Sequence, residues 1–322
     1  MTKVLIITNK QDLTSDFIIK ELKNRKIEFY RFNTEELNIT CSVTLNITDD
    51  KFILFDKISK KSYNLKLFTS VYFRRPEIPT FDSSSLNTGE IQFIKNEIAY
   101  TLEGIYKVLR NAYWISPIFS IREAENKIFQ LEIAKSIGFK IPDSIVTNSF
   151  YDSVDFYNKM NGECIIKPIR SGLIEDNNNP KVIFTNALTM RPSSKEQVEF
   201  SPNFFQRNIA KRYDIRVIVV GNTTFATLIH SQNNAETKID WRRGEYPLKH
   251  TKTELPDSIK KKCISMLKEL KLRFGAIDLI LNKKHEYIFL EINPNGQWAW
   301  IEKQTGHRIS KEIVNLLENE NF

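Results

Sequence analysis

The sequence has no hydrophobic run that approaches the roughly 20 apolar residues of a membrane-spanning helix, so we expect neither a transmembrane segment nor a membrane partner. Its first residues turn polar too early for a signal peptide and predict a strand over residues 3–8 instead. Cysteine is scarce: Cys41, Cys164 and Cys263 are far apart and form no CxxC pair. A disulfide framework or a structural zinc site is therefore not expected, and a reducing cytoplasm fits this composition.

Glycine-rich nucleotide motifs are missing as well. Neither GxGxxG nor GxxxxGKS/T follows the first strand, so the sequence supports neither a dinucleotide-binding fold nor a P-loop. The chain has only four histidines, and no Ser-His-Asp or Cys-His arrangement is evident. The sequence therefore does not point to catalysis through a covalent nucleophile.

Positive charge is in excess, with a net charge of +8 over 322 residues. The basic residues are spread along the chain, and the densest groups lie at residues 57–66 and 260–262. Such groups are usually solvated faces, although they also attract acidic partners. No aromatic–basic recognition motif accompanies them, so we do not expect a nucleic acid as partner, whereas an acidic peptide agrees with the charge.

The apolar pattern predicts a fold that mixes α/β and α+β structure. The predicted elements of the first half are strand 3–8, helix 14–25, strand 27–32, antiparallel strands 42–47, 51–55 and 70–73, helix 88–109 and helix 122–137. The strand–helix–strand start indicates an open α/β domain. In the long helix, apolar residues recur every three or four positions, which is the most regular helical pattern in the chain.

Two apolar runs near the C-terminus carry the most informative acids. Residues 274–281 contain Asp278 as their only charge, and the next run contains Glu291 and Asn293, which share one face of a strand because they are two apart. The polar turn at residues 282–286 predicts a hairpin that brings Asp278 close to Glu291. A buried carboxylate is costly unless it is paired or metal-bound, and two carboxylates with an amide oxygen suit Mg²⁺. The alternative is an ordinary hairpin whose acids lie in solvent.

Basic side chains stand at the ends of two predicted strands. Lys167 ends an apolar strand, which is a usual place to hold a nucleotide phosphate, and the alternative is a lysine on an edge strand. Arg74 and Arg75 end another strand, immediately before Pro76. Two such arginines either bind a phosphate or a carboxylate, or they lie on a surface turn.

Several motifs follow one another in a telling order. They are Lys127 on a linker helix, Lys167, Gln206-x-x-Ile209, Asp214-x-Arg216, Asp278 and Glu291-x-Asn293. This order resembles the ATP-grasp fold, in which two α+β lobes hold ATP between them. More narrowly, the chain resembles the ATP-grasp peptide maturases that make graspetides, the microviridin-type synthetases. The specific matches are Tyr72-Phe73-Arg74-Arg75-Pro76, Ser231-Gln232, Asp240-Trp241-Arg242 and the Gln297-Trp298-x-Trp300-Ile301-Glu302 ending of the last motif.

The resemblance covers nearly the whole chain and implies a role for each matching residue. It implies an N-terminal α/β pre-grasp domain at residues 1–118, a central lobe at 119–203 and a C-terminal lobe at 204–322. The implied ATP contacts are Lys127 and Lys167 at the phosphates, and Gln206, Arg207, Asn208 and Ile209 at the adenine. The implied Mg²⁺ ligands are Asp278, Glu291 and Asn293, with Asp278 and Asn293 also at the nucleotide. Arg216 would face the phosphates and the reacting carboxylate, and Asp240 and Arg242 would lie at the acceptor site. Arg207 stands where many members carry an acid, so the nucleobase preference stays open.

The implied activity is ATP-dependent macrocyclisation of a ribosomal precursor peptide. Glu or Asp side chains become acyl-phosphates, and Ser or Thr hydroxyls or Lys amines attack them to form esters or amides. The implied partners are a precursor with a leader and a Thr/Glu-rich core, bound in part around residues 171–200, and a second copy in a homodimer. The alternative enzyme is an ATP-grasp ligase that adds free amino acids to a peptide or protein, of the glutamate-ligase or glutathione-synthetase type. A nucleotide-sensing protein without turnover fits less well, because the metal set is complete.

Overall fold

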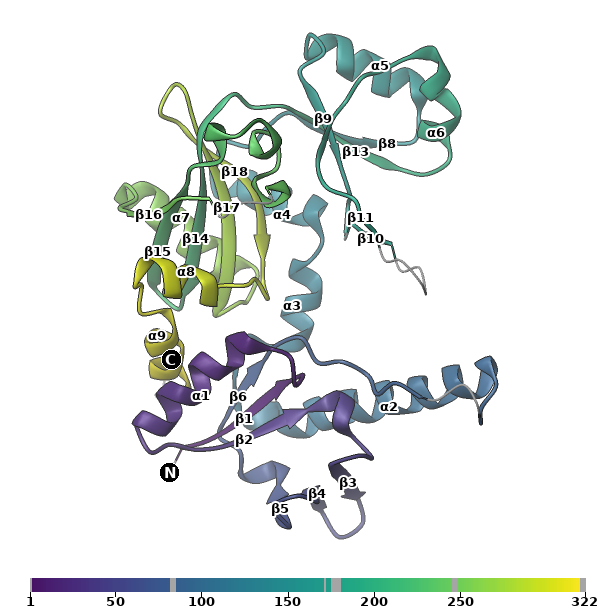
Figure 1. The fold of residues 1–322 in the computed structure, drawn as a ribbon, viewed down its shortest axis with the longest axis vertical. Helices are drawn as coiled ribbons and strands as arrows, with labels where there is room; N and C mark the ends of the chain where they lie inside the picture. The colour runs from purple at the N-terminus through teal and green to yellow at the C-terminus, as the bar shows by residue number, and fades with distance from the viewer. Residues whose placement is uncertain (1, 82–84, 171, 175–180, 245–247, 319–322) are drawn as a thin grey trace.

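The computed structural model describes residues 2–81, 85–170, 172–174, 181–244 and 248–318. Figure 1 shows an N-terminal domain at the bottom, a C-terminal lobe above it and a central lobe that stands apart at the top. Short 3₁₀ turns connect several elements: Thr34–Glu36, Leu65–Leu67, Leu109–Asn111, Pro192–Ser194, Ser231–Asn233, Ala235–Thr237 and Trp241–Arg243.

The N-terminal domain is built on a parallel sheet. Its elements are β1 (Lys3–Thr8), α1 (Leu13–Asn24), β2 (Glu28–Asn33), β6 (Ser70–Phe73) and β7 (Tyr113–Ile115). The strand order is β2-β1-β6-β7, and every neighbouring pair is parallel. The predicted strand–helix–strand start is confirmed, but the antiparallel assignment of residues 70–73 is wrong. All four of these residues are buried, which is typical of a parallel strand covered on both faces.

A small antiparallel sheet and a long helix complete this domain. The sheet contains β3 (Cys41–Asn46), β4 (Lys51–Asp56) and β5 (Lys61–Asn64) in that order. The predicted long helix is α2 (Thr88–Val108), which begins with a capping box formed by Asn87 and Glu90. Its C-terminal half buries Ile98, Leu102 and Ile105, while its N-terminal half extends beyond the rest of the domain (Figure 1).

The linker between the domains contains two helices where the sequence predicts one over 122–137. They are α3 (Ile118–Ala124) and α4 (Lys127–Ser136). The predicted single helix is wrong because the Asn126 side chain accepts hydrogen bonds from the backbone N–H groups of Ile128 and Phe129 and so starts a new helix. This break places Lys127 in the first turn of α4.

The central lobe is a four-stranded antiparallel sheet with helices on it. Its elements are β8 (Ser144–Thr147), α5 (Phe150–Lys159), β9 (Cys164–Lys167), β12 (Asn186–Ala187), α6 (Lys195–Glu199) and β13 (Asn203–Arg207). The strand order is β12-β9-β13-β8. A separate two-stranded ribbon, β10 (Leu173–Ile174) with β11 (Lys181–Val182), extends from it. The lobe has a hydrophobic cluster of its own, formed by Phe156, Met160, Cys164, Val198 and Phe205.

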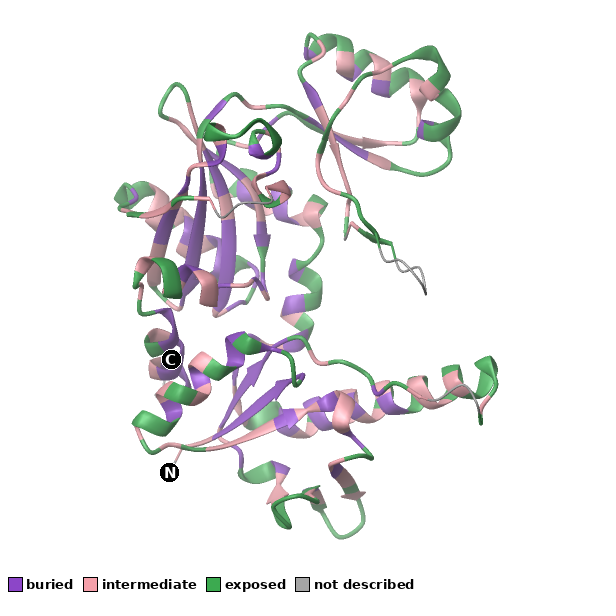
Figure 2. Cartoon of the chain, viewed as in Figure 1, coloured by how far each residue is buried: buried purple, intermediate pink, exposed green. Residues whose placement is uncertain are grey.

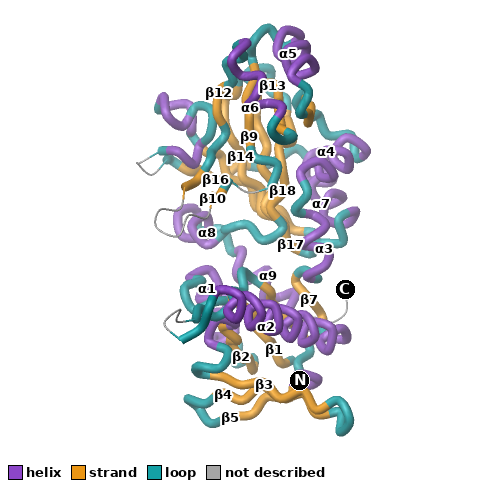
Figure 3. Tube along the Cα trace, turned by 90° about the vertical axis from the view of Figure 1, so that its right-hand side faces the viewer, coloured by secondary structure: helices purple, strands orange, loops and turns teal. Residues whose placement is uncertain are grey.

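The C-terminal lobe is a five-stranded antiparallel sheet. Its elements are β14 (Lys211–Val220), β15 (Thr223–Ile229), β16 (His250–Thr253), α7 (Asp257–Glu269), β17 (Phe274–Asn282), β18 (Tyr287–Asn293), α8 (Ala299–Thr305) and α9 (Ile309–Glu318). The order is β16-β15-β14-β17-β18, and the strands form a buried centre in Figure 2. In Figure 3, α4 and α7 lie on the same side of this sheet. The predicted hairpin of residues 274–281 with the following run is confirmed as β17 and β18.

The last helix, α9, packs against the first elements of the chain. Ile313 and Leu317 of α9 belong to one hydrophobic cluster with Ile6 of β1 and Ile18 of α1. Figure 1 shows α9 beside α1, close to the first strands. The N-terminal domain and the C-terminal lobe therefore share a core, whereas the central lobe keeps most of its cluster to itself.

Candidate active site

A cavity of about 550 Å³ lies between the central lobe and the C-terminal lobe. The ends of β9 and β13 form one wall, and β14, β17, β18 and α4 contribute to the other. The predicted site residues that line it are Lys127, Lys167, Gln206, Arg207, Asn208, Ile209, Asp240, Arg242, Asp278, Glu291 and Asn293. The remaining one, Arg216, reaches this set by donating from Nη1 to Asp278 Oδ2 at 3.2 Å. Residues far apart in the sequence thus converge on one cavity.

Two carboxylates face each other across the hairpin. Asp278 pairs in register with Glu291, and the register shifts immediately after Asp278. Bulges of this kind re-aim side chains and are frequent next to active sites. Burial raises the pKa of the Asp278 carboxyl despite the nearby Arg216 guanidinium. Burial also acts on Glu291, but the adjacent Lys127, Lys167 and Arg242 outweigh it and lower its pKa.

Two lysines from different elements, Lys127 of α4 and Lys167 of β9, lie near Glu291. Lys127 Nζ lies 3.3 Å from Glu291 Oε2 and donates to the Pro168 carbonyl at 3.0 Å. Lys167 ends β9, and its Nζ lies 4.6 Å from the centre of the Phe204 ring. Burial lowers the pKa of Lys167 to about 8, and the positive charges of Lys127 and Arg242 add to this effect against the attraction of Glu291. The cavity therefore concentrates positive charge in a poorly solvated place, which suits a polyphosphate.

A third group of charges lies on the loop after β15. The Arg242 guanidinium grips Asp240 with two hydrogen bonds, Nε to Oδ1 at 2.8 Å and Nη2 to Oδ2 at 2.7 Å. Asp240 is 5% exposed and also accepts from the Thr185 backbone N–H at 3.2 Å. Burial raises the pKa of Asp240, but the hydrogen bonds from Arg242 outweigh it and hold that pKa below its usual range. Asp240 therefore fixes Arg242, whose side chain is 49% exposed and is free to meet a ligand.

An aromatic ring extends this group toward the carboxylates. The Arg216 guanidinium lies 5.5 Å from the centre of the Trp241 ring, and the rings of Trp241 and Trp300 are 5.7 Å apart. Arg216 Nε is buried without a hydrogen-bond partner among the described residues. A buried donor with no acceptor is costly, so this atom is available to an oxygen of a bound anion.

The segment between the lobes, residues 206–209, is held by contacts with the central lobe. The Gln206 side chain is buried and donates to Ser144 Oγ at 2.9 Å. Arg207 lies within 3.9 Å of the carboxylates of both Asp143 and Glu163. The Asn208 N–H donates to the Glu163 carbonyl at 2.8 Å. The side chains of Gln206 and Arg207 are thus engaged with their own lobe.

A buried charge network next to the cavity is absent from the sequence-based predictions. Lys211 Nζ donates to Asp214 Oδ1 at 2.8 Å and to the Ile239 carbonyl at 3.1 Å. The Ser231 hydroxyl donates to the other Asp214 oxygen. Residues three apart on a regular strand point to opposite faces, but a register shift between Lys211 and Tyr213 brings Lys211 and Asp214 together. The sequence signal for this network is a lysine three residues before the Asp214-x-Arg216 motif, and spacing alone does not show that the two side chains are buried together.

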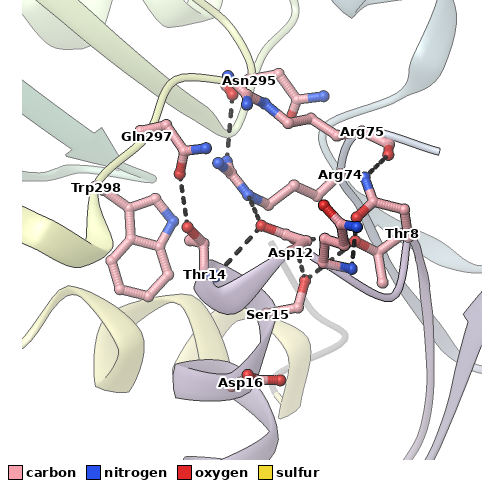
Figure 4. A network of polar contacts seen from close by, with 12 residues as sticks. Thr8, Asp12, Thr14, Ser15, Asp16, Arg74, Arg75, Asn295, Gln297 and Trp298 are labelled. Carbon is pink, nitrogen blue, oxygen red and sulfur yellow. Dashed lines mark hydrogen bonds and ion pairs between the residues drawn. The ribbon is translucent and has the colours of Figure 1, made fainter. Parts of the chain in front are cut away.

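Arg74 and Arg75 do not line the cavity. The Arg74 side chain is 1% exposed and pairs with Asp12 of the N-terminal domain, with Nε 3.2 Å from Oδ1 (Figure 4). Arg75 is exposed, with a φ of 46°. For Arg74 the surface-turn alternative is therefore wrong, and its guanidinium binds a carboxylate of the protein itself, that of Asp12, from a distant segment of the chain.

The donor set fits a hard divalent cation. The described residues contain no group of three or more His, Cys, Asp or Glu side chains that could hold a metal ion. The oxygens available are instead two opposed carboxylates, Asp278 and Glu291, with the amide of Asn293 at the end of the same strand. Mg²⁺ is typically held by one or two carboxylates, with waters and substrate phosphates completing its shell. The three side chains therefore fit Mg²⁺ better than a soft metal.

Comparison with known families covers nearly the whole chain. Residues 124–317 match the model of the RimK-like ATP-grasp domain, and residues 3–122 match that of the MvdD pre-ATP-grasp domain. The chain belongs to the RimK-like ATP-grasp family. The predicted ATP-grasp fold with an N-terminal pre-grasp domain is confirmed, and so is the prediction of a ligase.

Solved structures of similar ATP-grasp proteins align over the full chain. A ligase of Chryseobacterium gregarium associated with ribosomal peptide products, in complex with ADP and a leader and core peptide, has a TM-score of 0.91 at 29% identity and covers 100% of this chain and 98% of that one. The macrocyclase MdnC of Microcystis aeruginosa, bound to its precursor peptide, has a TM-score of 0.86 at 24% identity and covers 99% of this chain and 100% of that one. The resemblance to peptide-maturing ATP-grasp ligases is thus confirmed.

A curated relative points to a related ligase chemistry. The probable α-L-glutamate ligase of Haemophilus influenzae is 24% identical over 200 residues, which are 61% of this chain and 63% of that protein. The match thus spans less than two thirds of this relative.

No described helix is long and apolar enough to cross a membrane.

Proposed function

We propose that this ATP-grasp ligase uses ATP to cyclise a ribosomal precursor peptide through Glu or Asp side chains. The observation that carries the proposal is the match along the full chain, at 29% identity, to a ligase bound to ADP, a leader and a core peptide. The cavity supports it, because cationic groups surround a pair of buried carboxylates at the junction of two lobes. Such a site stabilises charge in a transferring phosphoryl group.

In this proposal the cavity binds ATP along its length. Lys127 and Lys167 contact the phosphates, because both ammonium groups lie beside Glu291 in the cavity. The backbone of Gln206, Arg207, Asn208 and Ile209 lines the adenine pocket, since the side chains of Gln206 and Arg207 are engaged elsewhere. Mg²⁺ would be held by Asp278, Glu291 and Asn293, and it would offset negative charge on the phosphates.

The protein side chains then position the reacting carboxylate. A Glu or Asp side chain of the peptide, placed by Arg216 and Arg242, attacks the γ-phosphorus, ADP leaves and an acyl-phosphate forms. A Thr or Ser hydroxyl, or a Lys amine, of the same peptide attacks the acyl carbon, and inorganic phosphate leaves with formation of an ester or amide. Asp240 holds Arg242 in place through its two hydrogen bonds. The chemistry depends on positioning and charge, and no covalent nucleophile of the protein is needed.

The partners and assembly extend the proposal. The ribbon of β10 and β11 exposes Leu173 and Val182, and Ile183 follows it. All three residues line the cavity, and we assign leader contacts to this part of residues 171–200. Residue 171 and residues 175–180 lie outside the described part of the chain. The net charge of +8 favours an acidic precursor. We also propose a homodimer and cytoplasmic action, which the free buried Cys41, Cys164 and Cys263 suit. Of the division at residues 1–118, 119–203 and 204–322, the last boundary lies within β13 (Asn203–Arg207), which pairs with β8 and β9 in the sheet of the central lobe.

A glutamate-adding ligase is the second candidate, because the curated relative of Haemophilus influenzae is a probable α-L-glutamate ligase. Both activities use the same ATP and metal groups, so the site residues do not separate them. The products do, because cyclisation lowers the mass of the peptide by one water per linkage, whereas ligation raises it by the mass of an amino-acid residue, which is the free amino acid less one water.

The test is the intact mass of a candidate precursor after incubation with the protein, ATP and Mg²⁺. We expect losses in steps of one water, which Glu291→Gln abolishes. A mass increase by one amino acid would move the assignment to the glutamate-adding ligase. If the purified protein releases ADP but accepts neither a precursor peptide for cyclisation nor a peptide for glutamate addition, the cyclisation proposal fails.

A further inference from the structure

Two motifs from opposite ends of the chain meet at the junction of the N-terminal domain and the C-terminal lobe. One is the end of β6, with Tyr72 and Arg74, and the other is the loop of residues 295–298 that follows β18. Figure 4 shows Arg74 and Asn295, one from each of these segments, with the contacts around them. The loop of residues 295–298 begins two residues after Asn293, whose side-chain amide is assigned to Mg²⁺ above.

Arg74 connects the two segments through a buried guanidinium. Its Nη1 donates to the carbonyls of Asn295 at 3.2 Å and Gly296 at 3.0 Å, while Nε lies 3.2 Å from Asp12 Oδ1. The Arg74 side chain is 1% exposed, and that of Asp12 is 2% exposed. A planar guanidinium presents its donors in a fixed fork, so the position of Asp12 sets where the two carbonyls lie.

Asp12 is itself held on all sides. Its Oδ2 accepts from the hydroxyls of Thr8 at 2.9 Å and Ser15 at 2.6 Å. Its Oδ1 accepts from the Thr14 backbone N–H at 3.3 Å, which caps α1. The carboxylate has little freedom, and neither does the guanidinium bound to it.

The same loop holds the Asn293 side chain. The Asn295 N–H donates to Asn293 Oδ1 at 3.0 Å, and the Gly296 N–H donates to the Asn293 carbonyl at 3.2 Å. Gly296 packs so tightly that a Cβ there would lie 2.5 Å from Cβ of Ala276 on β17. The peptide unit that joins Asn295 to Gly296 therefore contacts Arg74 through its carbonyl and the Asn293 carbonyl through its N–H, and it directly follows the peptide unit whose N–H holds the Asn293 side chain.

A neutral contact lies beside the charged one. The Thr14 hydroxyl donates to Gln297 Oε1 at 2.7 Å, and the Trp298 indole N–H lies 3.3 Å from the Tyr72 hydroxyl. Trp298 is fully buried, with its ring edge-on to Phe17 of α1. Contacts of Arg74, Thr14 and Tyr72 thus join the N-terminal domain to the loop.

We propose that Arg74, held by Asp12, is a positioning residue of the Mg²⁺ site, and that the N-terminal domain sets the affinity of that site by fixing the backbone that orients Asn293. The inference rests on the proposed metal role of Asn293. Arg74 itself touches neither nucleotide nor metal. Partners that orient metal ligands typically change metal affinity or activity by about 10–100-fold when they are removed.

The test compares Arg74→Lys with Arg75→Lys. A lysine at position 74 keeps a positive charge beside Asp12 but lacks the fork that reaches the loop carbonyls. Arg75 is adjacent and exposed, and lysine tolerates its backbone as well as arginine does. Calorimetric titration with ATP at a series of Mg²⁺ concentrations gives the Mg²⁺ needed for half-maximal binding. We expect this value to rise about tenfold in Arg74→Lys, with full binding regained at high Mg²⁺, and to stay at the wild-type value in Arg75→Lys.

Thr14→Val is a second variant, and it leaves every buried charged side chain in place. It removes the Thr14–Gln297 hydrogen bond, and we expect a shift in the same direction but smaller. If Arg74→Lys does not fold, Thr14→Val decides the matter. An unchanged Mg²⁺ dependence in the folded variants, or a loss of ATP binding that is equal at all Mg²⁺ concentrations, would overturn the inference. If the wild type binds Mg²⁺ and ATP but cyclises no peptide, the proposed function fails while the shift in Mg²⁺ dependence still tests Arg74.

Discussion

The protonation state of each carboxylate in the cavity depends on burial and on the charged side chains around it. Glu291 is ionised because Lys127, Lys167 and Arg242 surround it, whereas Asp278 carries a raised pKa in spite of Arg216. The two carboxylates are therefore unequal, although they lie opposite each other on one hairpin. A cation that binds both would favour the ionised form of Asp278, which ties metal binding to proton release.

Replacing Glu291 tests this arrangement most directly. We expect Glu291→Gln to lower kcat by about 10²–10³-fold, because one electrostatic contact of a transferring group is typically worth that much. Turnover is measured by ADP release with peptide present. Glu286→Gln is the matched control, since Glu286 lies at the turn of the same hairpin, pairs with Lys140 and is remote from the cavity. Equal turnover of the two folded variants would contradict the metal assignment.

The lowered pKa of Lys167 predicts that ATP affinity depends on pH. Its pKa of about 8 means that the cation is present below pH 8 and is lost as the pH rises through that value. If the cation contacts phosphate, ATP affinity should fall about tenfold between pH 7 and pH 9. Lys167→Arg should flatten the curve, because arginine stays charged throughout. Parallel pH curves for ATP binding by the wild type and the variant would rule out this role for Lys167.

Arg242 separates nucleotide binding from peptide chemistry. We expect Arg242→Ala to retain ATP binding and to lose cyclisation by at least about 10²-fold. Arg243→Ala is the control, because Arg243 lies on the same turn and donates to Asn186 Oδ1 instead. Calorimetry reports ATP binding, and intact mass reports the product. Loss of ATP binding in Arg242→Ala would move this residue to the nucleotide.

At the scale of elements, breaks in regular structure place the site. A new helix start at Asn126 puts Lys127 at the beginning of α4, and the register shift after Asp278 aligns it with Glu291. The Gln130 side chain then fastens α4 to β18, with its Nε2 donating to the Ile292 carbonyl at 2.8 Å and its Oε1 accepting from the Ile292 N–H at 3.0 Å. The lysine on one element and the glutamate on the other are thereby held in contact.

The bulge in β14 predicts a measurable coupling between Lys211 and Asp214. Lys211→Met leaves Asp214 buried without its cation, which typically costs 3–5 kcal/mol. The double variant Lys211→Met/Asp214→Asn should recover much of this loss, since asparagine still accepts from Ser231 and carries no charge. Urea unfolding of the four proteins in the cycle gives the coupling energy. Strictly additive losses would show that the pair does not act as a unit.

Element prediction succeeded where the signal is local. The periodicity of residues 88–109 and the apolar runs of residues 274–281 and 164–167 correspond to α2, β17 and β9. The prediction of elements failed where a capping side chain or a distant strand determines the local structure. The break in the helix predicted over 122–137 depends on how Asn126 turns, and the direction of residues 70–73 depends on β1 beside it.

At the scale of the whole molecule, the central lobe is the separable part. The hydrophobic clusters of the N-terminal domain and the C-terminal lobe run into each other, whereas Phe156 and its neighbours form a cluster inside the central lobe. Figure 1 shows this lobe standing apart from the body. Regions with few contacts to the rest open at lower free energy, so we expect the central-lobe wall of the cavity to open more readily than the wall formed by the C-terminal lobe.

Phe156→Ala should reveal this division. Truncating a buried phenylalanine typically costs about 3–5 kcal/mol, and we expect the loss to fall on the central lobe alone. Hydrogen exchange should accelerate in residues 144–207 and remain unchanged in β1 and β14, while ATP affinity falls. Tyr151→Ala is the control, because Tyr151 lies on the same helix and is 75% exposed. Equal acceleration in all three regions would mean that the molecule unfolds as one unit.

The sequence alone determined the elements with regular apolar spacing, the ATP-grasp order of motifs and the oxygen and nitrogen donors of the cavity, since these depend on residue type and on neighbours along the chain. Only the tertiary structure decided which charges meet. Arg74 finds Asp12 and the loop after Asn293, Lys211 reaches Asp214 through a bulge, and Asp240 turns inward to hold Arg242. The lowered pKa of Lys167 likewise requires walls from several elements. Arg74 and Asp12 come from distant segments, and the pairs 211/214 and 240/242, although close in sequence, depend on a bulge and on burial, which spacing along the sequence does not encode.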